Sequence, residues 1–195
     1  MNWKTLLFIA LIAYGAYQHF ANRSVTHTPG ETASQTPQQI AVDAASFNHL
    51  GYTITPLEHV TLAARVLGRE RYWLDRGAKL SPIDLALGWG PMSDEAVLSQ
   101  LHIIQGNRFY YWRAATLPMP RKQIETHSAN MHIIPATAEI EDRLQAVKVG
   151  QTIQLTGYLV QASGKDGFTW KSSLTREDTG FGACELLYVT RASLS

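Results

Sequence analysis

Residues able to do chemistry concentrate in two stretches of this chain, 120–135 (PRKQIETHSANMHIIP) and 172–185 (SSLTREDTGFGACE). Histidine can act as a general base or a metal ligand, a cysteine thiolate as a nucleophile, and arginine as an anion-binding group. We expect the two stretches to meet in space and form one polar site. The ligand-binding residues of this hypothesis are His127, Asn130, His132, Arg176 and Asp178.

The histidine spacing argues against a metal centre. A zinc-binding helix places two histidines four residues apart, whereas His127 and His132 are five apart. On a helix this spacing turns one ring ~140° from the other, and on a strand it puts them on opposite faces. They converge only if the backbone changes conformation between them, which Asn130 permits as a common left-handed helix end. The single cysteine also rules out a zinc site built from several thiolates. We predict no metal site, and we predict no cofactor.

A structural interpretation of the same stretch is simpler. His127 would lie in the last turn of a helix that begins near Arg121, where a partial positive charge suits the helix dipole. Asn130 would then end the helix, and the ring of His132 would hydrogen-bond a loop carbonyl. Three apolar residues would pack into the core: Met131, Ile133 and Ile134.

Cysteine catalysis is the alternative function. Cys184 would need a base, His127 or His132, and an orienting partner such as Asn130 or Asp178. This set would make the protein a hydrolase or transferase. However, Cys184 enters a predicted strand, where no helix dipole helps to form a thiolate, and a cysteine there is usually a small buried hydrophobe.

The remaining polar and aromatic candidates are weaker. Glu177 and Asp178 are adjacent and point apart in an extended chain, which makes them poor acid–base partners. Arg176 could instead bind an anionic ligand. A stacking platform for sugars or bases is one interpretation of three aromatic residues, and filling of a sheet-on-helix core is the other: Tyr110, Trp112 and Trp170.

The first half of the segment 47–195, called the body below, has the patterns of strands interrupted by short helices. Residues 60–66 alternate in polarity as a half-buried strand does. Ser81, followed by a proline and an acid, is typical of a helix start, and a second short helix is expected over 93–101. Residues 103–113 read as a hairpin with Gly106 and Asn107 in its turn.

The second half predicts one longer helix and three strands. Apolar spacing indicates a helix over 138–148, capped by Thr137. Strands follow over 151–160, where Gly157 suggests a bulge or bend, and over 168–173 and 184–190. The elements predict an α+β fold, with a bent antiparallel sheet or small β-barrel and inserted short helices, preceded by one N-terminal transmembrane helix.

The amino terminus predicts that transmembrane helix. Residues 1–21 contain an uncharged run, TLLFIALIAYGAY, that extends just far enough to cross a hydrocarbon core of ~30 Å. A cleaved signal peptide is the alternative. Lys4 favours an orientation with the body outside the cytoplasm. The Thr-, Gln- and Pro-containing stretch 22–46 predicts a flexible linker, and 47–195 a single globular α+β domain.

Composition bounds the function. The chain has 195 residues, 45% hydrophobic, with 17 Lys+Arg and 16 Asp+Glu for a net charge of +1. This composition indicates a globular chain with an ample core. The even charge balance argues against nucleic acid as a partner, because such binders depend on counterion release.

Two segments in particular, HSANMHIIPA and SSLTREDTGFGACE, resemble a family of uncharacterised bacterial membrane-anchored proteins. The resemblance implies a bacterial source and a shared site, and no particular chemistry. With the predicted anchor it places the protein in the inner membrane as a single-pass protein with a periplasmic body. We therefore hypothesise a membrane-tethered binding or interaction module of the bacterial envelope, whose partners are the membrane and a protein or small-molecule ligand.

Overall fold

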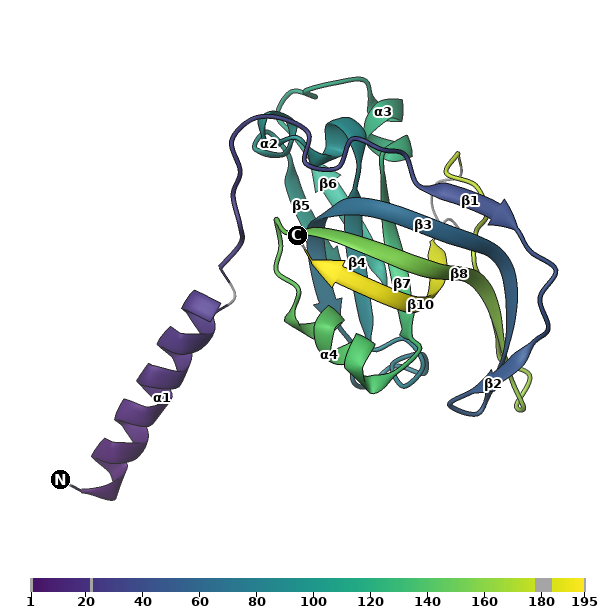
Figure 1. Cartoon of the computed structure of the whole chain (residues 1–195). Coiled ribbons are helices and arrows are strands. Elements are labelled where there is room, and N and C mark those ends of the chain that lie inside the picture. Colours follow the sequence, from purple (N-terminus) through teal and green to yellow (C-terminus); the bar gives the residue numbers. More distant parts are fainter. Residues whose placement is uncertain (1, 22, 178–183, 195) are drawn as a thin grey trace.

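The computed structural model describes residues 2–21, 23–177 and 184–194, and within 16–21 only the backbone. It confirms the α+β class: one large bent sheet carries a few short helices (Figure 1). The helices are α1 (Trp3–Ala21), η1 (Gly90–Ser93, a 3₁₀ turn), α2 (Glu95–Leu98), α3 (Arg121–Thr126) and α4 (Ala138–Ala146). The strands are β1 (Gln38–Ala41), β2 (Phe47–His49), β3 (Tyr52–Arg71), β4 (Ile83–Gly88), β5 (His102–Gly106), β6 (Phe109–Arg113), β7 (Ser128–Pro135), β8 (Thr152–Gly164), β9 (Thr169–Lys171) and β10 (Glu185–Leu194).

The strand pairings return to their starting point. The order runs β3–β4–β7–β10–β8, and β8 also pairs with β3, so five strands form a ring. β7 and β10 are parallel, while the other pairings of the ring are antiparallel. The sheet is therefore mixed, and the prediction of a purely antiparallel sheet is wrong at this one pairing.

Strand irregularities let the sheet bend. β3 pairs first with β8 and then with β4, and its register shifts between Pro56 and Glu58 and again between Val66 and Gly68. Gly157 pairs with Val189, next to a register shift of β10 against β8, so the predicted bulge or bend corresponds to an irregularity of this pairing. A Cβ at Gly157 would lie 2.0 Å from the Tyr188 carbonyl oxygen, so only glycine allows this approach.

Apolar side chains fill both faces of the ring. The inner cluster takes alternate residues from every ring strand, including the predicted stripe Val60, Leu62, Ala64 and Val66, and is completed by Leu144 of α4. Two outer clusters lie beneath other elements. The hairpin β5–β6 covers Ala86 and its neighbours, and Trp170 packs near Leu186 and Ile134.

Local signals located α4 and the hairpin correctly but failed at one strand. Thr137 caps α4 by accepting a hydrogen bond from the Ile140 amide, as predicted. The hairpin is present, although its turn holds Asn107 and Arg108 at positive φ rather than Gly106 and Asn107. The helix predicted from Ser81 is instead β4, all of whose residues are buried. A strand buried on both faces has no polar alternation, so it is easily mistaken for a buried helix.

The amino-terminal segments divide into a helix and a stretch that contacts the body. α1 is the apolar segment predicted to be an anchor, and within the described residues no helix meets the length and apolarity needed to cross a membrane. Part of the stretch predicted as a linker lies against the body. The Val25 amide donates to the Val149 carbonyl (2.8 Å), His27 contacts the Gly150 carbonyl, and Ala33 is buried.

Candidate functional site

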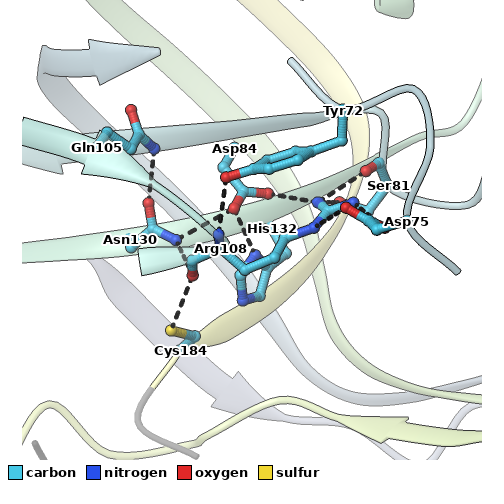
Figure 2. Close-up of polar contacts among 9 residues, drawn as sticks. All are labelled: Tyr72, Asp75, Ser81, Asp84, Gln105, Arg108, Asn130, His132 and Cys184. Carbon is cyan, nitrogen blue, oxygen red and sulfur yellow. Dashed lines mark hydrogen bonds and ion pairs between the residues drawn. The ribbon is translucent and has the colours of Figure 1, made fainter. Parts of the chain in front are cut away.

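A buried carboxylate organises the polar residues around β4 and β7. Asp84 of β4 is fully buried, and one of its oxygens lies 2.8 Å from a guanidinium nitrogen of Arg108 (Figure 2). Arg108 sits in the turn between β5 and β6, which therefore brings a cation over the outer face of the ring. A buried charge needs such a partner because leaving water is costly.

Arg108 also holds the β3–β4 connection, residues 72–82. Its guanidinium donates to both carboxylate oxygens of Asp75 (2.9 and 3.0 Å) and to the Ser81 carbonyl (2.9 Å). The same group stacks 3.7 Å from the ring centre of Tyr72, and the Arg108 amide donates to the Tyr72 hydroxyl. One side chain thus fixes this connection at three points along its length.

Two of the predicted site residues complete this network from β7. Asn130 donates to the second Asp84 oxygen (3.3 Å) and to the Arg108 carbonyl (3.0 Å), and it accepts from Gln105. Nδ1 of His132 lies 2.9 Å from the same Asp84 oxygen. The geometry of that pair is not that of a hydrogen bond. The His132 ring is buried against Trp170, with 4.7 Å between ring centres.

The network shifts two proton affinities. Burial, reinforced by the negative charge of Asp84, raises the pKa of Tyr72 to about 12 despite the opposing effect of Arg108. For Asp75, burial alone would raise the pKa, but its hydrogen bonds to Arg108 and to backbone amides outweigh burial and lower the pKa. At neutral pH the network therefore holds a neutral Tyr72 and an ionised Asp75 around the guanidinium.

Of the two predicted stretches, only parts meet. β7 and β10 pair directly, and Cys184 donates to the Arg108 carbonyl that also binds Asn130. His127 ends α3 instead, where its ring contacts the Gln123 carbonyl, so its backbone and that of His132 belong to different elements. Asp178 lies outside the described residues.

Arg176 belongs to a second polar cluster. It forms a 2.7 Å ion pair with buried Glu185, contacts Gln39, and stacks 4.8 Å from the ring of Trp89. Glu185 aligns with Met131, whose side chain belongs to the inner apolar cluster, whereas Asn130 and His132 lie on the other face of β7. The five predicted ligand-binding residues therefore do not form one constellation.

The predicted structural roles are confirmed for much of stretch 120–135. Met131, Ile133 and Ile134 are buried, and His127 caps α3. Asn130, however, lies within β7 rather than ending a helix. The aromatic candidates separate: Tyr110 and Trp112 pack between the hairpin and the ring, and Trp170 packs by His132.

A cleft lies next to the Asp84 network. Its volume is about 520 Å³, which is within the usual range for small-molecule sites of roughly 300–1,000 Å³. The β3–β4 connection forms one wall and the first turns of α4 another. The lining includes His49, Arg71, Tyr72, Trp73, Lys79 and Glu141.

Sequence reasoning missed the two residues at the centre of this arrangement. Asp84 is the only charged residue within the buried segment 83–88 (IDLALG), and an isolated acid in an apolar run was the available signal. Arg108 gave no signal, because its role depends on a turn that folds onto β4.

In the described part of the chain no group of three or more His, Cys, Asp or Glu side chains could hold a metal ion.

Comparisons of the chain with family models, with curated proteins and with solved structures find no match. The resemblance noted for HSANMHIIPA and SSLTREDTGFGACE therefore stays a prediction.

Proposed function

We propose that this protein is a membrane-tethered binding module of the bacterial envelope, with residues 1–21 as its anchor and the cleft beside α4 as its ligand site. The cleft carries the proposal, because it combines apolar surface with a few polar groups, as small-molecule sites do. Arg71 and Lys79 give its rim positive charge and Tyr72 and Trp73 give it aromatic surface. The ligand class that fits is a small anion with an apolar or aromatic part.

The Asp84 network supports this function by positioning the cleft. Tyr72, Asp75 and Ser81 all belong to the connection that walls the cleft, and all three contact Arg108. A binding site held by a rigid shell loses less entropy when a ligand binds. The buried polar residues thus act as positioning residues rather than as reacting groups.

The fold gives weaker, analogical support. We interpret the ring of five strands as a small barrel. Its cyclic order, with the third and fifth strands parallel, is similar to that of the fold that binds oligonucleotides and oligosaccharides. In that fold the connection between the first two strands contributes to binding, and here that connection is residues 72–82. Fold similarity alone does not define a ligand.

The tether is proposed from the sequence of the amino terminus. Lys4 is the only Lys, Arg, Asp or Glu within residues 1–21, and this near absence of charge beside a run of apolar residues is what supports an anchor here. The body would then face the periplasm, since positively charged flanks favour the cytoplasmic side.

A fluorescent anionic probe, anilinonaphthalene sulfonate, tests the cleft in the full-length detergent-solubilised protein. We expect one saturable site whose affinity falls roughly fivefold in Lys79→Ala, as loss of an exposed ion pair predicts. Lys122→Ala, an exposed lysine of α3 paired with Glu177, is the matched control. Equal affinities in both variants would overturn the assignment of the cleft.

The enzymatic alternative places Cys184 with His127 or His132 in a hydrolase or transferase. The structure favours it less, because His127 caps α3 and the His132 ring is buried against Trp170. Turnover of an ester, amide or glycoside by the purified protein, lost in His127→Ala, would replace the binding function with this one.

A further inference from the structure

The β3–β4 connection ends in an exposed apolar tip. Trp73 and Leu74 are adjacent, with 72% and 98% of their surfaces exposed. Neither contributes to the apolar clusters of the body. Single exposed apolar residues are ordinary, but tryptophan is enriched at membrane–water interfaces, and here it lies beside an almost fully exposed leucine.

Positive charge flanks this tip. Arg71, Arg76 and Lys79 lie within the same stretch, and Asp75, its only acid, is bound by Arg108. Arg76 pairs with the exposed Asp166, and Lys79 forms no ion pair within the described part of the chain. Exposed basic residues beside an apolar tip are attracted to anionic lipid headgroups.

The base of the tip is held rigidly. The Tyr72 amide donates to the Pro82 carbonyl (2.9 Å) and so closes the connection at its base. The Ala78 and Leu80 amides donate to the carbonyls of Asp75 and Gly77, which forms consecutive turns. A preformed tip can enter a membrane surface without the cost of ordering a flexible loop.

The segment after α1 docks on the residues that follow α4, and the last turn of α4 contacts the base of the tip. Val25 bonds Val149, just after α4, and Arg71 at the base of the tip bonds the Gln145 carbonyl of α4 (2.5 Å). Four residue steps separate Ala21, the end of α1, from Val25, and they span at most ~14 Å. If α1 is the anchor, the body cannot move far from the bilayer.

We propose that the Trp73–Leu74 tip inserts into the interfacial layer of an anionic bilayer and forms a second membrane contact. This inference rests on the membrane tether of the proposed function. With two contacts the body is oriented rather than free to rotate on its tether. The cleft, which Trp73 also lines, then opens at the membrane surface.

Site-specific depth measurements test this contact in the full-length protein reconstituted into phosphatidylcholine–phosphatidylglycerol vesicles. An environment-sensitive fluorophore is attached to Leu74→Cys in a Cys184→Ala background. Thr116→Cys is the matched control, since it is an exposed position in the β6–α3 connection, which Figure 1 places at the end of the body away from α4. We expect quenching by bromolipids at position 74 but not at position 116.

Two further measurements test the membrane contact without an attached fluorophore and test the contribution of the basic residues to it. Bromolipid quenching of intrinsic tryptophan emission should decrease in Trp73→Phe, without any cysteine substitution. Arg76→Gln and Lys79→Gln should each lower the ratio of docked to undocked protein roughly fivefold in anionic vesicles. Neither should change that ratio in vesicles of phosphatidylcholine alone.

The outcomes separate this inference from the tether. Protein that resists carbonate extraction while position 74 is as water-exposed as position 116 would overturn the inference and keep the anchor. Protein that carbonate extracts, but whose position 74 is quenched by anionic vesicles, would keep the contact and refute the anchor.

Discussion

Arg108→Ala should be among the most destabilising single substitutions in this body. The change removes the guanidinium that lies 2.8 Å from Asp84, whose side chain is 0% exposed, while Arg108 itself is 16% exposed. Breaking a buried ion pair from one side leaves the other charge uncompensated and costs about 3–5 kcal/mol. Asn130 and His132 remain near Asp84, which favours the lower part of that range.

Thermal unfolding followed by circular dichroism measures this cost. For a chain of this size each kcal/mol shifts Tm by about 2–4 °C, so we expect a decrease of roughly 10 °C. Arg76→Ala is the control, because its ion pair with Asp166 is exposed on both sides. We expect its Tm to match that of the wild-type protein.

A double substitution tests whether the uncompensated charge of Asp84 causes this destabilisation. Asp84→Asn removes the buried charge, so Asp84→Asn combined with Arg108→Met should destabilise less than the sum of the two single changes. If Arg108→Ala proved as mild as Arg76→Ala, or if the two changes were additive, the buried pair would not be what stabilises this region.

Three other predictions follow from single contacts. Burial raises the pKa of Tyr110 to about 12 and is the largest cause of the same shift at Tyr72. The stability that each tyrosine contributes is complete below pH ~10, the pKa in the unfolded chain, and is lost as pH rises through about 12. In an ultraviolet titration, Tyr110→Phe should show one late-titrating tyrosine fewer than the wild-type protein. Cys184, which donates to a backbone carbonyl, should react with iodoacetamide slowly until the protein unfolds, and fast native labelling would favour the catalytic alternative. Gly150→Ala should release the segment after Arg23 to proteases, because the new Cβ would lie 1.8 Å from the Val25 carbonyl oxygen at a φ of +89°; unchanged proteolysis would contradict that docking.

Several elements could be predicted because their signals are local. Thr137 and the apolar spacing after it define α4, since a cap and a helical period involve residues within a few positions of each other. The alternation of apolar and polar residues in β3 likewise indicates a strand with one buried face. Gly157 indicated a bend because glycine alone allows a close backbone approach there.

The candidate site was harder to predict because its parts are distant in sequence. His127, Asn130 and His132 are neighbours in sequence, yet α3 ends at the first and β7 holds the other two. Arg176 pairs with Glu185 rather than joining them. Proximity along the chain therefore gave the wrong grouping of these side chains.

The sequence by itself determined the amphipathic elements, the hairpin and the apolar amino terminus, because each depends on the order of adjacent residues. Only the tertiary structure decided that 83–88 is a strand, since it pairs with β3 and β7 and is covered by the inner cluster on one face and by the hairpin on the other. Only the tertiary structure paired Asp84 with Arg108, because a buried carboxylate takes its partner from whatever cation the fold brings within reach.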